Sequence, residues 1–201
     1  MTSRNIFIGL IIGFLIGLFA IPSLQNSDLI QKIPSPYLVL LVALPVAAAV
    51  GVALAEILGR WVPIVWQAVK FGIVGVLNTT LDFGVLNILI LATGFEKGLP
   101  LAILNVGSFA AAVTNSYFWN RRWVFGGASG NEVAKFAEFI VVSLVGAIIS
   151  SAMVGSITQY FTPPLGLSGA QWANVAKAAA VLFAMVWNFL GYKFVVFRRR
   201  V

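Results

Sequence analysis

The stretch IFIGLIIGFLIGLFAIPSL, residues 6–24, decides the fold class of this chain. It contains no charged side chain, and a helix of about 20 apolar residues crosses the roughly 30 Å of hydrocarbon in a bilayer. Its length, and the lack of a small-residue cleavage pattern before Pro22, favour a membrane span over a signal peptide. The stretch therefore predicts a transmembrane helix.

Five more apolar stretches of similar length follow, and the whole composition agrees with them. The chain is 60% hydrophobic and 9% charged, with a mean hydropathy of +0.99, whereas soluble domains are about 25% charged. We predict an all-α integral membrane protein with six spans. The later spans cover Tyr37–Leu58, Phe71–Leu91, Leu101–Phe118, Phe136–Gln159 and Trp172–Val195.

The sequence lacks the side chains and motifs that most enzymes use in catalysis. It has no cysteine and no histidine, so it lacks thiolate ligands, the commonest metal ligand and the usual general base near neutral pH. It also lacks a Walker loop or a nucleophile paired with a histidine. We therefore expect no catalytic centre, no metal, no cofactor and no use of ATP by this chain.

The net charge of +7 is better explained by membrane orientation than by nucleic acid, because most cations flank the spans. With six spans, ten of them fall on one side, and the positive-inside rule places that side, with both termini, in the cytoplasm. We expect the inner membrane of a prokaryote. The ten are Arg4, Arg60, Lys70, Arg121, Arg122, Lys135, Lys193, Arg198, Arg199 and Arg200.

The first span carries Gly9, Gly13 and Gly17, a repeated small-xxx-small pattern that lets helix backbones approach closely. One interpretation is packing against the second span, which is rich in alanine. The other is contact with a second copy in a homo-oligomer.

Residues 70–125 and 138–197 are similar enough to predict an internal repeat. A shift of 68 aligns the first helices and places Asn78 on Gly146. A shift of 72 aligns the second helices and places Asn120 on Tyr192. Each copy has two spans, so the copies have the same topology and are related by an axis along the membrane normal.

Three segments of this repeat resemble the GtrA-like family of small membrane proteins. They are KFGIVGVLNTTLD (70–82), NSYFWNRRWVF (115–125) and NFLGYKFVVF (188–197). The resemblance covers about residues 65–200 and implies a four-helix domain at 61–201. Residues 1–60 would be an added two-helix hairpin, because such proteins usually have four spans.

The family resemblance implies a role in cell-surface polysaccharide synthesis. Its members are thought to move polyprenyl-phosphate-linked sugars across the membrane or to serve as the membrane part of polyprenyl-phosphate glycosyltransferases. We therefore expect such a lipid, membrane lipids and a glycosyltransferase as partners.

Asp82 is the most informative single residue, because an isolated carboxylate inside a span is costly unless it is paired or hydrated. We predict that it belongs to a polar path between the two hairpins, and the alternative is a helix–helix hydrogen bond that only holds the bundle together. The predicted path consists of Asn78, Asp82, Asn105, Asn115, Ser116, Lys177 and Asn188.

Cations at the cytoplasmic ends of the spans predict a site for a phosphate headgroup, since arginine binds phosphate bidentately. The same cations would also result from membrane orientation alone. The candidates are Arg121, Arg122, Lys193 and Lys70, with Asn120 and Tyr192 beside them.

We expect a facilitator that moves a polyprenyl-phosphate sugar to the outer leaflet. A non-transporting subunit that anchors a glycosyltransferase is the alternative. A small-solute or ion transporter that depends on Asp82 is a third.

Overall fold

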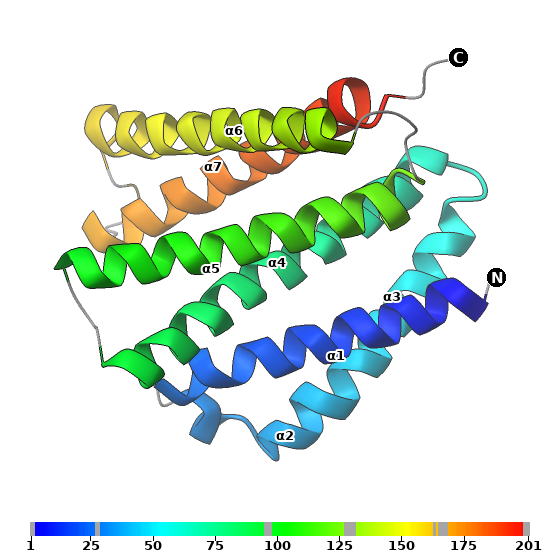
Figure 1. Ribbon diagram of the computed structural model, residues 1–201, viewed down its shortest axis with the longest axis horizontal. Helices are drawn as coiled ribbons and strands as arrows, with labels where there is room; N and C mark the ends of the chain where they lie inside the picture. Colours follow the sequence, from blue (N-terminus) through cyan, green and yellow to red (C-terminus); the bar gives the residue numbers. More distant parts are fainter. Residues whose placement is uncertain are drawn as a thin grey trace. The chain divides into compact units, whose positions relative to one another are not determined.

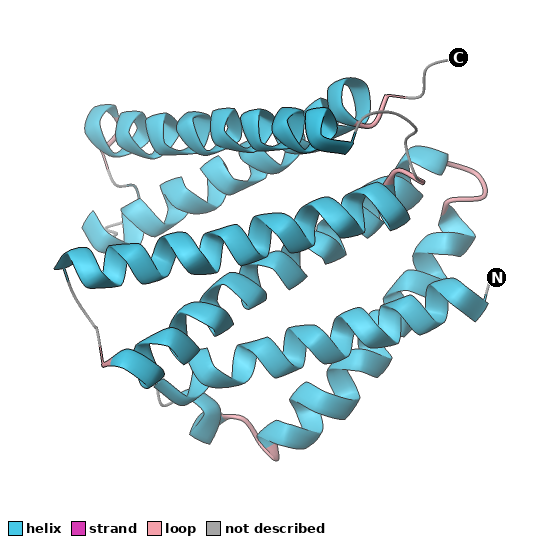
Figure 2. Cartoon of the chain, viewed as in Figure 1, coloured by secondary structure: helices cyan, strands magenta, loops and turns pink. Residues whose placement is uncertain are grey.

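The computed structural model describes residues 3–26, 29–94, 98–126, 132–162, 164 and 169–198. Over these residues the chain is helical, without a strand (Figure 2). It divides into two compact units, Met1–Gly126 and Gly127–Val201, and each is described on its own.

The first unit contains the helices of the first four predicted spans (Figure 1). The second contains those of the last two. The first unit comprises α1 (Ser3–Asn26), η1 (Leu29–Lys32), α2 (Pro36–Leu38), η2 (Val39–Ala43), α3 (Leu44–Leu58), α4 (Pro63–Thr93), α5 (Gly98–Trp119) and η3 (Asn120–Val124). The second comprises α6 (Glu132–Tyr160), α7 (Gly169–Gly191) and η5 (Tyr192–Val196).

Each predicted span lies within a continuous run of helical residues, and the ends differ by a few residues; the second span covers α2, η2 and α3, and the sixth covers α7 and η5. In the part of the chain that is described, three helical stretches are long and apolar enough to cross a membrane, namely Ser3–Gln25, Pro36–Leu58 and Pro63–Thr93. The chain is thus an all-α membrane protein. The count of six crossings and the division at residue 60 stay predictions.

Proline and glycine set the ends of α4, the longest helix of the first unit. Pro63 lies in its first turn, where the missing N–H costs nothing and the fixed φ suits a helix. Gly94 ends it with φ 70, and its N–H donates to the carbonyl of Ile90 at 2.7 Å, as in a left-handed cap that other residues rarely adopt.

The glycines of α1 pack against α3 and the preceding η2 within the same chain. A Cβ on Gly13 would lie 2.6 Å from Cα of Pro45, and one on Gly9 would lie 3.0 Å from Cα of Ala49. A Cβ on Gly17 would collide with the carbonyl oxygen of Leu40. The structure therefore shows the first of the two interpretations, and contact with a second copy through these glycines would require α3 to leave this face.

Helix α1 also packs against α4. A Cβ on Gly84 would collide with the carbonyl oxygen of Phe19, and Asn87 donates through Nδ2 to Oγ of Ser23 at 3.1 Å. The two added helices are therefore joined to the third span through α1.

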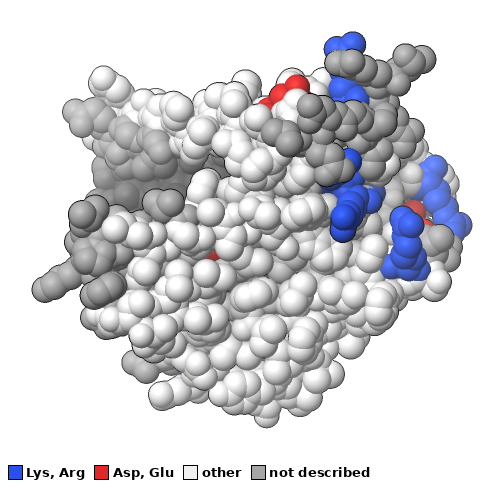
Figure 3. All heavy atoms as spheres, in the orientation of Figure 1, with Lys and Arg blue, Asp and Glu red and all other residues white. Residues whose placement is uncertain are grey.

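Successive helices of the first unit run in opposite directions. The start of α1 reaches η3, since Nε1 of Trp123 donates to Oδ1 of Asn5 at 3.3 Å. The start of α4 lies there too, because Nζ of Lys70 donates to the carbonyl of Trp123 at 2.7 Å. We call this the basic end, formed by the start of α1, the turn between α3 and α4, and η3. The face of the first unit that Figure 3 shows is mostly white, and blue atoms gather at its right-hand end with a few red ones among them.

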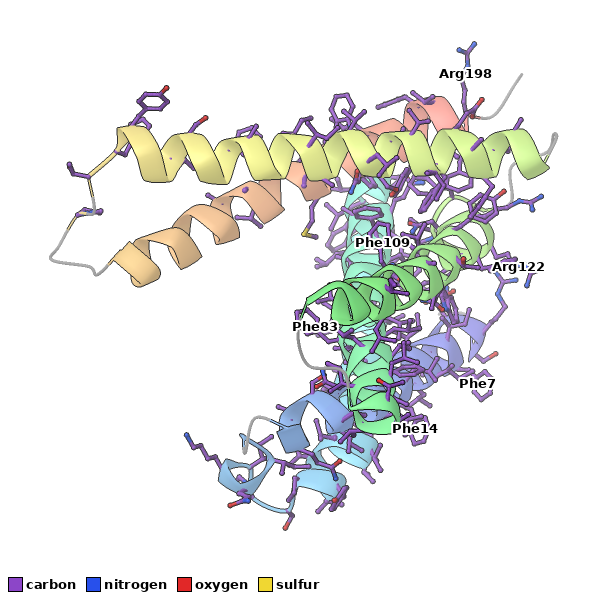
Figure 4. All side chains as sticks on the ribbon, turned by 60° about the vertical axis from the view of Figure 1, so that its left-hand side comes forward. Phe7, Phe14, Phe83, Phe109, Arg122 and Arg198 are labelled. Atoms are coloured by element: carbon purple, nitrogen blue, oxygen red, sulfur yellow. The ribbon has the colours of Figure 1, made fainter. Side chains whose placement is uncertain are left out.

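Apolar side chains cover the outside of the first unit. Phe7 is 62% exposed, Phe14 43% and Phe83 55%, and all three are labelled in Figure 4. Such exposure would be unfavourable in water and suits lipid contact.

The second unit is a tightly packed hairpin of α6 and α7. A Cβ on Gly191 would lie 2.5 Å from Cγ1 of Val142. Near the start of α6, the ring of Phe139 stacks on Tyr192, with 4.1 Å between the centroids.

Candidate functional site

Lys70 lies at the basic end of the first unit, where it closes the end of α5. Its Nζ donates to the carbonyls of Trp123 at 2.7 Å and Val124 at 3.2 Å. Nε2 of Gln67 donates to the carbonyl of Val124 at 3.3 Å. Carbonyls at a helix C-terminus have no partner in their own helix, so these two side chains supply one from α4.

Three tryptophans surround this contact. Trp123 makes edge-to-face pairs with Trp66 at 6.3 Å and with Trp119 at 6.2 Å between centroids. Nζ of Lys70 lies 4.9 Å from the ring centroid of Trp66 and 5.9 Å from that of Trp123. The ammonium is therefore held by carbonyls and by ring faces, which attract cations. Lys70, one of the predicted headgroup residues, therefore connects α4 to η3 through these contacts.

A pocket of about 450 Å³ lies beside the tryptophans. Its size is in the range of small-molecule sites. The guanidinium carbon of Arg122 lies 5.3 Å from the ring centroid of Phe118, over its face. The pocket thus combines two arginines with apolar walls. Its lining residues are Arg4 and Ile8 of α1, Phe118 and Trp119 of α5, and Arg122 and Trp123 of η3.

Hydrogen bonds lead from this pocket along the contact between α4 and α5. Nε1 of Trp119 donates to Oδ1 of Asn115 at 3.1 Å. Nδ2 of Asn115 donates in turn to Oδ1 of Asn78 at 2.6 Å. The structure therefore brings together two residues of the predicted polar path, and both face their own hairpin partner.

Asp82 lies one helical turn beyond Asn78 on α4. Its Oδ1 accepts a hydrogen bond from Oγ of Ser108 at 2.7 Å, and Ser108 is 0% exposed. The helix–helix hydrogen bond of the alternative interpretation is thus present. A role of Asp82 in a path between the hairpins stays a prediction, because the two units are described separately.

The predicted residues near η3 and η5 differ in their surroundings. Asn120 is 1% exposed and donates to the carbonyl of Ser116 at 2.8 Å. Tyr192 is 4% exposed, and its hydroxyl lies 2.6 Å from Oγ of Ser143. Nζ of Lys193 lies 5.5 Å from the ring centroid of Phe194. Asn120 and Tyr192 therefore make packing contacts inside their hairpins.

The remaining predicted residues have fewer described contacts at the site. A Cβ on Gly146 would lie 2.6 Å from Oδ1 of Asn188, so this asparagine packs against the place where α6 carries no side chain. Arg121 follows Asn120 in η3. The side chains of Asn105 and Lys177 lie outside the described residues, as do Arg199 and Arg200.

The sequence missed part of the site. The sequence patterns give Arg4 a role only in membrane orientation, and they give Ser108, Gln67 and Trp119 no individual role. A spacing signal existed for Ser108, which lies seven residues before Asn115 and so on the same face of a helix. No pattern signals the meeting of Arg4 with Arg122, because it depends on how α1 packs.

The two hairpins end in the same unusual way. Each closes in a π-helical turn, Asn120–Val124 in the first and Tyr192–Val196 in the second. The N–H of Phe125 donates to the carbonyl of Asn120 at 2.9 Å, and that of Phe197 to Tyr192 at 2.8 Å. The turns are 72 residues apart, from 120 to 192, which is the shift that the sequence alignment requires. The full layout of the repeat stays a prediction.

Comparison with known proteins agrees with the position of these hairpins. The family model described as "GtrA/DPMS, transmembrane domain" matches residues 70–197. An "Uncharacterized membrane protein YngA" of Bacillus subtilis (strain 168) is 32% identical over 131 residues, which cover 64% of this chain and 77% of that protein. No solved structure matches. The match begins at Lys70 and ends at Phe197, so it takes in both hairpins and both π-helical turns, and the chain belongs to the GtrA/DPMS transmembrane-domain family.

Proposed function

We propose that the protein facilitates translocation of a polyprenyl-phosphate-linked sugar across the membrane, for synthesis of a cell-surface glycan. The physical problem is a polar headgroup that must cross hydrocarbon while its tail stays in lipid. Family membership supports the class of protein. One observation carries the rest, namely the line of polar side chains that leads from the basic end into α4.

This line reaches far into the first unit. Lys70 and Asp82 are 12 residues apart, from 70 to 82, or about 18 Å along a helix. Asn78 lies between them and bonds to Asn115 at 2.6 Å. Each of these side chains has a partner at rest, so burial does not leave it unsatisfied. Sugar hydroxyls can replace these partners, because they both donate and accept hydrogen bonds.

The proposal includes the predicted orientation. The basic end faces the cytoplasm of a prokaryote, so its cations meet the phosphate of a lipid made on that side. Asn105, Ser116, Lys177 and Asn188 stay predicted residues of the path in this proposal. The chain is not an enzyme in this proposal.

Reconstitution in proteoliposomes tests the proposal, with a labelled polyprenyl-phosphate sugar placed in one leaflet. Asp82→Asn removes the charge but keeps an oxygen for the hydroxyl of Ser108, so the helix contact is retained. We expect wild type to move the label and Asp82→Asn to move it at least tenfold more slowly. The matched control is Thr114→Val on α5, because Thr114 is exposed and bonds its own helix at Ala110. Label that stays in its leaflet with wild-type protein would refute transport.

The alternative is a membrane subunit that anchors a polyprenyl-phosphate glycosyltransferase. One observation favours it, namely that Asp82 and Asn78 bond to Ser108 and Asn115 inside the hairpin, as purely structural groups would. It predicts that Asp82→Leu lowers stability or recovery of the complex and leaves lipid movement unchanged.

A further inference from the structure

The added helix α1 contributes Arg4 to a pocket whose other walls belong to the family domain. Arg4 lies outside the matched residues, whereas Arg122 lies inside them. Both line the same pocket of about 450 Å³, although 118 positions, from 4 to 122, separate them in the sequence. Figure 4 shows Arg122 at the end of α5, on the side where α1 begins.

We propose that Arg4 and Arg122 together bind the phosphate of an isoprenoid lipid, so that the N-terminal helix supplies half of the headgroup site. This deepens the proposed function, because it rests on a polyprenyl phosphate as the substrate.

Charge selects an anion at this place. Of the six residues that line the pocket, two are arginines and none is acidic. Two guanidinium groups at one pocket repel each other, and an anion between them removes that cost. Low-dielectric walls strengthen the attraction, and guanidinium matches a phosphate through paired N–H donors.

The walls select a lipid over a soluble phosphate. Ile8, Phe118, Trp119 and Trp123 supply the remaining lining. Phe118 is also 46% exposed, so this wall continues onto the surface that faces lipid. A chain attached to the phosphate can therefore leave sideways into the bilayer, whereas an inorganic phosphate gains nothing from such walls.

The fold holds Arg4 at this position. The neighbouring Asn5 accepts the hydrogen bond from Nε1 of Trp123 at 3.3 Å. Farther along α1, Ile12 is 0% exposed and Gly17 meets the carbonyl of Leu40. The start of α1 is thus fixed against η3 by the hydrogen bond at the residue next to Arg4, and the rest of α1 is held by packing farther along the helix.

Binding rather than transport tests this proposal. Full-length protein is placed in phosphatidylcholine nanodiscs, and a fluorescent polyprenyl monophosphate is titrated in. We expect Arg4→Gln and Arg122→Gln each to weaken binding at least tenfold, and Arg4→Lys to lie between wild type and Arg4→Gln, because it keeps the charge and loses the paired N–H donors. The matched control is Arg60→Gln, because Arg60 is an exposed cation at the basic end that does not line the pocket. It should change binding less than twofold.

Three results would overturn the proposal. Arg4→Gln could bind as wild type does, which would remove α1 from the site. Arg60→Gln could weaken binding as much as Arg4→Gln, which would mean unspecific surface charge. Phosphatidylglycerol or inorganic phosphate could displace the probe as well as unlabelled polyprenyl monophosphate does, which would remove the isoprenoid.

The two proposals fail separately. If both arginine variants bind the probe weakly but wild-type protein does not move the lipid-linked sugar, the binding site is supported and the transport proposal is refuted. If wild-type protein moves the lipid-linked sugar and Arg4→Gln binds the fluorescent polyprenyl monophosphate as wild type does, transport is supported and this binding site is refuted.

Discussion

Replacing Lys70 by methionine tests whether the contact between α4 and η3 holds the basic end together. Methionine keeps most of the apolar stem and removes the ammonium. The change removes the hydrogen bonds from Nζ to the carbonyls of Trp123 at 2.7 Å and Val124 at 3.2 Å, of which the second carbonyl keeps Gln67 as a donor. It also removes a cation from the faces of Trp66 and Trp123.

The loss follows from these contacts. Hydrogen bonds to charged groups contribute about 1.5–3 kcal/mol each, and a cation–π contact adds about 0.5–1 kcal/mol. Removing a half-buried charge regains part of its desolvation penalty. We therefore expect a net loss of about 2 kcal/mol in the free energy of unfolding. The matched change Gln67→Met removes one neutral hydrogen bond, at 3.3 Å, and should cost less than about 1 kcal/mol.

Thermal unfolding in detergent measures both variants, followed by tryptophan fluorescence because three indoles surround the site. A loss of about 2 kcal/mol lowers the midpoint by roughly 4–8 °C in a chain of this size. The emission of folded Lys70→Met should also change, since the ammonium no longer faces two rings. Equal midpoints for wild type and Lys70→Met, with unchanged emission, would show that water satisfies these carbonyls and that Lys70 does not brace η3.

Two further predictions concern helix packing. Gly17→Ala should lower the unfolding midpoint by an amount equivalent to about 1–3 kcal/mol, because its Cβ meets the backbone carbonyl of Leu40. The control Gly51→Ala, where nothing lies within 4 Å, should be neutral or stabilising by up to about 1 kcal/mol. Equal losses of stability in the two variants would contradict the packing of α1 on η2. Tyr192→Phe keeps the ring but loses the hydroxyl contact with Ser143 at 2.6 Å, so it should cost about 1 kcal/mol in the same assay, and a much larger loss would mean that the hydroxyl has another role.

The sequence predicted the helices well because each is a long apolar stretch between polar turns. For example, Tyr37–Leu58 was expected and Pro36–Leu58 is helical. Apolar length is a local property, and in a membrane every backbone group must be satisfied within its own helix. The glycine face of α1 was also predictable as a packing face, since only its partner was left open.

Side-chain partners could not be predicted in the same way. The sequence indicated that Asp82 needs a partner but not that Ser108 provides it, because the pairing depends on how two helices are rotated about their axes. The contact of Lys70 with a phosphate stays a prediction, and the structure shows its ammonium donating to two backbone carbonyls. Carbonyls are present at every residue, so no sequence pattern marks the ones that a lysine caps.

The Asn78–Asn115 pair and Lys70 have no like counterparts at the aligned positions of the second hairpin. On the proposed alignment, the pair of Asn78 and Asn115 corresponds to Gly146 and Trp187, and Lys70 corresponds to Glu138. Trp187 donates instead to the carbonyl of Val142 at 3.0 Å.

This asymmetry bears on where an anion binds. A carboxylate at the position of Lys70 repels a phosphate, so the two hairpins differ at this position even though both end in a π-helical turn. The predicted contact of Lys193 with a headgroup stays a prediction. Helix α1 packs on the first hairpin, where Lys70, Arg122 and the polar line are. The site proposed above combines α1 with these residues, so loss of α1 should impair anion binding more than it impairs the packing of the second hairpin.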